Sequence, residues 1–231
     1  MSPRHGPGAA GAIMLPTGHL VDPFALGPGD IARLPLAQIL PETLATLPRF
    51  GGCPPGPAYS VAQHCCELAL AFANPALGLA GPADEWPRAG YRDDCMAWAL
   101  LHEVFEALTG LDVPSPIKRR WPLYRDTEAY VLQHVCGLYG IDPAEPACLE
   151  ADARIVLDEA AWLFGRDSAP LFAAPGTRPL GIRPDRRWDF EEASRRFRDL
   201  WLSHVAPRRR DGADPRVSAL AMRRAVGTVP A

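Results

Sequence analysis

The chain has 231 residues, of which 48% are hydrophobic and 22% are charged. This composition is typical of a globular domain and excludes a disordered chain, a coiled coil and a collagen-like fibre. The formal net charge of −3 argues against a nucleic-acid-binding protein. One domain of this size buries about 70% of its unfolded surface, so its core needs neither disulfides nor a metal to fold.

The six cysteines favour reduced thiols over a disulfide framework. Two of them, Cys65 and Cys66, are adjacent, and the sequence contains no CxxC pair. The N-terminus lacks the apolar stretch of a secretory signal, and no apolar run reaches the ~18 residues that span a bilayer. We therefore expect a cytoplasmic protein that does not enter the membrane.

The chain begins with a segment rich in glycine and proline, residues 1–12, which we predict to be a flexible leader. Two short apolar stretches follow, at 13–15 and 19–21, on either side of Thr17–Gly18. A threonine–glycine pair between apolar stretches favours a turn, so this region predicts a small β-hairpin.

Helical spacing of apolar residues begins after the hairpin. It covers residues 31–47, with an expected break at Pro41, which is suited to the first turn of a new helix. The next helix is expected over residues 61–72. Ser60 is a suitable N-cap for it, and Gln63 stands three residues later, as in a capping box.

Four further helices follow the same apolar period. The first is expected to run from Asp93 or Asp94 to about Leu108 and to stop at Gly110. The others are predicted at residues 126–138, 145–164 and 188–205. The sequence therefore predicts an all-α protein, a compact bundle of about six helices filling one domain, residues 13–205, with no visible repeat.

The C-terminal segment, residues 206–231, differs from the rest because arginine outnumbers acidic residues in it. We predict a basic, disordered tail. An alternative is an arm that contacts nucleic acid or an acidic partner, in which case the protein would be an interaction protein whose tail carries the function.

A set of polar residues on the predicted helices could support chemistry. His102 and Glu106 are four residues apart and share one face of a helix. With His64, Glu103 and Asp152 they form a mixed nitrogen and oxygen set that suits Mn²⁺, Fe²⁺, Co²⁺ or Zn²⁺. Their spacing forms no compact motif, and HEVFE lacks the second histidine of HExxH, which excludes a zincin.

Four segments in order give these residues a context: RFGG (49–52), YSVAQHC (59–65), ALLHEVFEALTGLDVPSPIKR (99–119) and EADARIVLDEA (150–160). This order resembles the HD-domain phosphohydrolases, and most closely the branch of the bacterial 5′-deoxynucleotidases. The resemblance covers about residues 13–205 and implies the helical HD-domain fold.

The resemblance implies four ligands for a divalent metal ion, which could be Mn, Co, Fe, Zn or Mg. His64 matches the first metal-binding histidine of the family, and His102 matches the histidine of the paired HD motif. Glu103 stands where the family has the aspartate of that motif. Asp152 matches the distal aspartate ligand.

The resemblance also implies residues that act on the substrate. Glu106 matches the acidic residue that activates or protonates the reacting groups, and Asp112 matches the aspartate before the PxP segment. Arg49 matches an arginine that contacts the substrate, and a guanidinium suits phosphate. Lys118 follows Pro114–Ser115–Pro116 and either edges a phosphate site or begins a solvated helix.

The expected function is therefore a metal-dependent phosphohydrolase acting on nucleotides, removing phosphate from a (deoxy)nucleoside 5′-monophosphate. One alternative is a dNTP triphosphohydrolase that uses the same site. Because Glu103 replaces an aspartate, a non-catalytic nucleotide or phosphate sensor is a second alternative. The resemblance further implies a homo-oligomer with a small-molecule nucleotide as its substrate.

Overall fold

The computed structural model describes residues 11–79 and 89–209, and these are mostly helical. The predicted all-α class is confirmed, with 63% helix and one two-stranded antiparallel hairpin. Within the described residues the helices are α1 (Pro28–Arg33), α2 (Leu36–Thr46), α3 (Val61–Ala73), α4 (Tyr91–Leu101), α5 (Val104–Thr109), α6 (Ser115–Lys118), α7 (Pro122–Tyr139), α8 (Pro146–Phe164) and α9 (Phe190–His204).

The predicted N-terminal hairpin is confirmed. Strand β1 (Ile13–Met14) pairs antiparallel with β2 (Leu20–Val21), and Ile13 lies opposite Val21. Gly18 adopts a φ of 76° in the turn, a conformation that glycine reaches without strain. None of the described helices is long and apolar enough to cross a membrane.

Two predicted helix boundaries are wrong. The break in residues 31–47 falls at Leu34–Pro35, between α1 and α2, and Pro41 lies inside α2. The long helix expected up to Gly110 is interrupted at His102 and Glu103, which separate α4 from α5. Apolar spacing continues across this interruption because both helices are buried, so the pattern alone does not reveal it.

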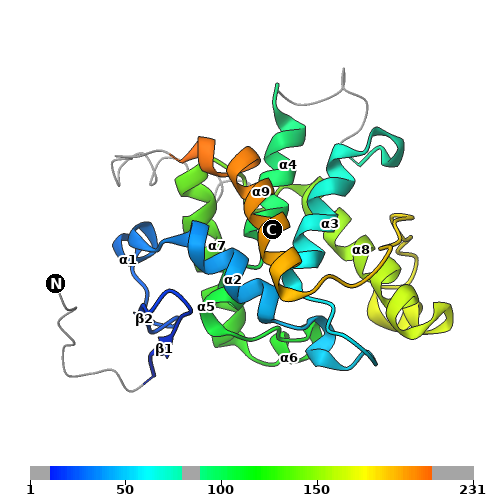
Figure 1. Cartoon of the computed structure of the whole chain (residues 1–231), viewed down its shortest axis with the longest axis horizontal. Coiled ribbons are helices and arrows are strands. Elements are labelled where there is room, and N and C mark those ends of the chain that lie inside the picture. The colour runs from blue at the N-terminus through cyan, green and yellow to red at the C-terminus, as the bar shows by residue number, and fades with distance from the viewer. Residues whose placement is uncertain (1–10, 80–88, 210–231) are drawn as a thin grey trace, which may run out of the picture.

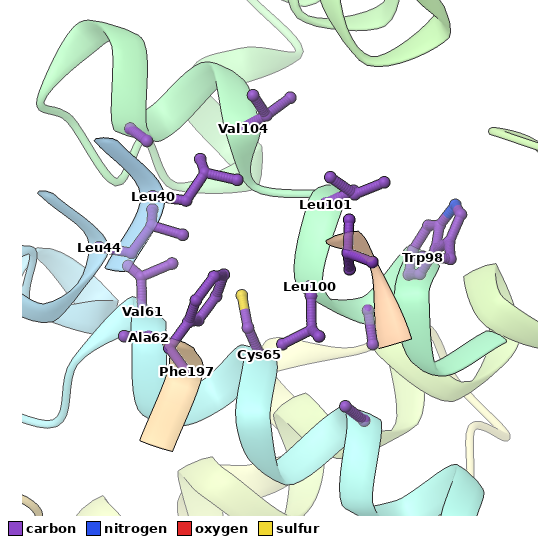
Figure 2. Packing of buried hydrophobic residues seen from close by; sticks show 14 of the residues in the cluster. Leu40, Leu44, Val61, Ala62, Cys65, Trp98, Leu100, Leu101, Val104 and Phe197 are labelled. Atoms are coloured by element: carbon purple, nitrogen blue, oxygen red, sulfur yellow. The ribbon is translucent and has the colours of Figure 1, made fainter. Parts of the chain in front are cut away.

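Helix α9, orange in Figure 1, lies across α2, α3 and α4. Phe197 of α9 is fully buried, and in Figure 2 its ring lies among Val61, Ala62 and Cys65 of α3, with Leu44 of α2 nearby. Helix α4 packs along α3 and also contacts α8. This arrangement brings together the three helices that carry the predicted metal ligands.

The start of the predicted tail is part of the folded body. Arg208 contacts the Asp94 carboxylate, and Arg209 donates a hydrogen bond of 2.6 Å to the carbonyl of Ala32. The rest of the predicted tail, residues 210–231, and most of the predicted leader, residues 1–10, lie outside the described residues.

Candidate metal centre and phosphate site

A short β-bridge fixes the segment that carries Arg49. Pro48 pairs with Ser60, the Arg49 amide donates to the Tyr59 carbonyl at 2.8 Å, and the Val61 amide donates to the Leu47 carbonyl at 2.9 Å. The loop between residues 49 and 59 therefore starts and ends at the N-terminus of α3. This places Arg49 close to the helix that carries His64.

The residue after Arg49 has an unusual backbone. Phe50 has a φ of 56°, in the left-handed region that bulky side chains avoid. Its ring packs edge-on against Phe164 and Phe172, with centroids 5.4 and 5.3 Å away. Packing of the ring offsets the backbone strain and holds the turn that directs Arg49 into the protein.

His64 lies on α3, which begins where the sequence predicts. The Ser60 hydroxyl accepts a hydrogen bond of 3.1 Å from the Gln63 amide, as an N-cap does. His64 is fully buried, and its Nδ1 donates to the Oε1 carboxylate oxygen of Glu159 at 2.6 Å. Because a carboxylate can only accept, the proton is on Nδ1, and the neutral ring directs a lone pair from Nε2.

His102 follows the last residue of α4 and is oriented in the same way. Its Nδ1 donates to the Ala99 carbonyl at 2.9 Å, and its ring stacks on Trp98 at a centroid distance of 4.7 Å. The Nε2 atoms of His102 and His64 lie 3.2 Å apart. If both Nε2 atoms were unprotonated, their lone pairs would repel at this distance, so the pair favours a proton or a metal ion between them.

Two carboxylates lie beside the two histidine Nε2 atoms. Asp152 Oδ1 lies 3.3 Å from His64 Nε2 and 3.5 Å from His102 Nε2, and Glu103 Oε1 lies 3.5 Å from His102 Nε2. Ligand atoms bound about 2.1 Å from one metal ion lie roughly 3.0–3.5 Å from each other. His64, His102 and Asp152 therefore have the spacing of ligands to one divalent metal ion, and Glu103 lies at ligand spacing from His102. Of them, His64, His102 and Glu103 also meet a general geometric criterion for a metal-binding cluster.

The charge of the surroundings favours a cation at this point. Burial lowers the pKa of His102, but the negative charge of Glu103 and a hydrogen bond with Asp152 outweigh it and raise the pKa to about 10. Burial acts in the opposite direction on Asp152, yet its hydrogen bonds to both histidines hold its pKa well below the usual value. The site thus stabilises added positive charge, which a metal ion would supply in place of protons.

Arg49 contacts the same Glu103 oxygen, Oε1, that lies beside His102. Its guanidinium donates to Glu103 Oε1 at 3.1 Å and to Glu159 Oε2 at 3.3 Å, and its side chain is 11% exposed. Its Nε is buried and has no hydrogen-bond partner. A buried donor without a partner costs free energy, which an anionic ligand would recover.

Glu106 and Lys118 form a second group beside the first. The Lys118 ammonium donates to Glu106 Oε1 at 3.0 Å and to Glu128 Oε1 at 2.6 Å. Burial raises the pKa of Glu106 well above its usual value, and the negative charge of Glu103 adds to this effect. The second carboxyl oxygen of Glu106, Oε2, is buried without a partner, so Glu106 is arranged to carry a proton.

Asp112 lies between α5 and α6 and is partly buried. Its negative charge contributes to the raised pKa of Arg49 and to the raised pKa of Glu106. The structure therefore gathers all eight residues selected from the sequence in one region, in two adjoining groups. They are Arg49, His64, His102, Glu103, Glu106, Asp112, Lys118 and Asp152.

Sequence analysis missed three residues that bind this set together. Glu159 contacts His64 and Arg49, Tyr59 donates to Glu159 Oε1 at 2.7 Å, and Glu128 holds Lys118. Glu159 had one available signal, since it stands seven residues after Asp152 and so shares its face of α8. Tyr59 stands in the YSVAQHC segment beside His64, but that segment does not indicate its contact with Glu159. Glu128 had no signal, because it reaches the site from α7.

Glu67 offers a test of this buried network by pH. Burial raises its pKa from 4.5 to about 7, although hydrogen bonds from Gln63 and Tyr59 oppose the increase. Folding therefore favours the protonated form, so this group's contribution to stability is present below pH 4.5 and is lost as pH rises through about 7.

The loss reaches up to about 3 kcal/mol. The variant Glu67→Gln should not show this loss of stability, because glutamine does not titrate. Between pH 4.5 and pH 8, the free energy of urea unfolding should therefore fall by about 2–3 kcal/mol more in the natural protein than in the variant. Glu150→Gln is the control, because the Glu150 side chain is 69% exposed. Equal pH dependence in both variants would contradict the assignment.

No family model matches the chain, and no curated protein matches its sequence.

Proposed function

We propose that this chain is a metal-dependent phosphohydrolase of the HD-domain type that acts on nucleotides. Its simplest activity would be the removal of phosphate from a (deoxy)nucleoside 5′-monophosphate. The observation that carries the proposal is the convergence of His64 Nε2, His102 Nε2 and Asp152 Oδ1, within 3.2–3.5 Å of one another, next to a buried arginine with a free donor. The nucleotide itself rests on the resemblance of the four sequence segments.

In this proposal His64, His102, Glu103 and Asp152 hold the metal. A bound divalent ion would polarise a phosphoryl oxygen and lower the pKa of water, which are the two contributions that phosphate ester hydrolysis needs. Arg49 binds the phosphate through its unpaired Nε and offsets the negative charge on the equatorial oxygens. Its ion pairs with Glu103 and Glu159 hold the guanidinium in place for that contact.

Glu106 handles the proton of the leaving group. Burial raises the pKa of the carboxyl and so favours its protonated form, and Lys118 binds Oε1, which leaves Oε2 free to donate to the leaving 5′-oxygen. Lys118 uses two of its three N–H donors on Glu106 and Glu128, so one stays available to a phosphate oxygen. Asp112 is close enough to influence both Arg49 and Glu106.

Phosphate release from a panel of nucleotides tests this function. Nucleoside mono- and triphosphates would be incubated with Mn²⁺, Co²⁺, Mg²⁺ or EDTA, with a sugar phosphate as the non-nucleotide control. We expect inorganic phosphate from nucleoside 5′-monophosphates with at least one metal, and none with EDTA. Release from the sugar phosphate at the same rate would contradict nucleotide specificity.

Two other results would change the conclusion. Release of inorganic triphosphate from dNTPs would identify the site as a triphosphohydrolase. No release with any metal, from protein shown by circular dichroism to be folded, would overturn the hydrolase proposal and favour a nucleotide or phosphate sensor.

A further inference from the structure

Glu159 lies at the centre of the buried contacts behind the candidate metal centre. It is on α8, two turns after Asp152, and no part of it is exposed to solvent. Its two carboxylate oxygens serve different partners. Oε1 accepts from His64 Nδ1 at 2.6 Å and from the Tyr59 hydroxyl at 2.7 Å, whereas Oε2 accepts from Arg49 at 3.3 Å.

The contact with His64 has a direct consequence for the opposite side of the ring. A carboxylate that accepts from Nδ1 fixes the tautomer, so Nε2 has no proton and directs its lone pair toward His102 and Asp152. It also fixes the ring plane, because the 2.6 Å contact allows little rotation. His64 has no freedom to compensate, since it is buried on α3 against α4.

The contact with Arg49 acts on the other half of the site. Arg49 would be drawn toward any anion, including the carboxylates that surround the two histidines. Glu159 and Glu103 bind its two terminal nitrogens at 3.3 and 3.1 Å and so leave Nε as the guanidinium nitrogen without a partner. One carboxylate therefore orients a nitrogen ligand for a cation and restrains the arginine that faces an anion.

We propose that Glu159 is a positioning residue that prepares His64 to bind the metal and at the same time limits the attraction of Arg49 for phosphate. This inference rests on the proposed function, because it assigns His64 and Arg49 their roles. Glu159 itself touches neither metal nor phosphate. Removing its charge should therefore change the affinities for a cation and for an anion in opposite directions.

The test compares Glu159→Gln with the natural protein in two binding measurements, both on protein shown by circular dichroism to be folded. Mn²⁺ alone is titrated by calorimetry or electron paramagnetic resonance, and inorganic phosphate alone is titrated into metal-free protein. We expect Mn²⁺ binding to weaken about 10–100-fold, as for other carboxylates that orient metal-bound histidines. Phosphate binding should stay unchanged or become tighter, because a negative charge next to Arg49 is lost.

Glu67→Gln is the matched control. The Glu67 carboxyl lies 3.1 Å from the same Tyr59 hydroxyl, but its hydrogen bonds are with Tyr59 and Gln63 and not with His64 or Arg49. The same substitution there should leave both affinities unchanged. Tyr59→Phe removes the hydroxyl that donates to Glu159 and leaves its contacts with His64 and Arg49, so Mn²⁺ affinity should change by no more than about fivefold.

If Glu159→Gln does not fold, the same two titrations are made on Glu159→Asp. It keeps the charge but withdraws the carboxylate from Nδ1 by one methylene, so Mn²⁺ binding should weaken while phosphate binding stays the same. Mn²⁺ affinity within about threefold of the natural protein, in either folded variant, would overturn the inference. Equal weakening of Mn²⁺ binding and phosphate binding would also overturn the inference, because a residue with a general structural role would affect both affinities alike.

The failure of the inference and the failure of the proposed function give different results. If the natural protein binds Mn²⁺ and Glu159→Gln binds it equally well, only the role of Glu159 is wrong. If the natural protein binds no Mn²⁺, Co²⁺ or Mg²⁺, the proposed metal-dependent function falls, and the role of Glu159 falls with it.

Discussion

Replacing His102 with alanine should abolish high-affinity metal binding and lower phosphate release by about a thousandfold or more, because the metal contributes several kcal/mol to stabilising the transition state. His102 supplies one of the two nitrogen atoms of the candidate site, and its Nε2 lies 3.2 Å from that of His64. Alanine leaves one nitrogen and the carboxylates, a weaker set for the metals that favour imidazole. Metal titration and phosphate release on the same preparation would measure both effects.

His134→Ala is the matched control for this substitution. His134 also lies on a helix and also donates from Nδ1 to a backbone carbonyl, that of Tyr130, at 2.7 Å. It belongs to neither of the described groups of candidate metal ligands. Its removal should leave metal affinity and turnover unchanged. Full activity in folded His102→Ala would show that the histidine pair does not hold a catalytic metal.

Phe197→Ala should reduce the free energy of unfolding by about 3–5 kcal/mol, the cost of removing a fully buried phenyl ring from a packed core. Phe197 is completely buried and joins α9 to the layer formed by α2 and α3 (Figure 2). The ring packs next to Cys65, the residue that follows His64 on α3. Urea or thermal unfolding would measure the loss.

Phe190→Ala makes the same substitution at the start of the same helix. Phe190 is 47% exposed, so its removal should change the free energy of unfolding much less, by about 1 kcal/mol or less. Equal losses at the two positions would mean that α9 does not dock on α2 and α3 as the structure describes.

The break between α4 and α5 orients two residues of the candidate metal centre. Glu103 has φ and ψ of −95° and 20°, outside the helical region, and stands between the two helices. In an uninterrupted helix, His102 and Glu103 would project about 100° apart. The interruption lets both side chains face the same point, with Glu103 Oε1 3.5 Å from His102 Nε2.

Local sequence patterns predict the helical class, the N-terminal hairpin, the N-cap at Ser60 and the helix end at Gly110. Each of these depends on residues within about two turns of each other, so apolar period, capping residues and turn residues are sufficient to predict them. The break at Pro35 and the position of Pro41 inside α2 were missed, because packing of α2 in the core overrides the local preference of proline.

The same limit applies to the candidate site, where local patterns identify residues but not their arrangement in space. Four sequence segments selected His64, His102, Glu103 and Asp152, but their order along the chain says nothing about the distances between their atoms. Packing of distant helices brings the two Nε2 atoms to 3.2 Å, brings Arg49 to Glu159 across 110 residues, and buries Glu106 so that its pKa is raised. These properties depend on packing of distant helices and on removal of water, and neither is written in a local pattern of residues.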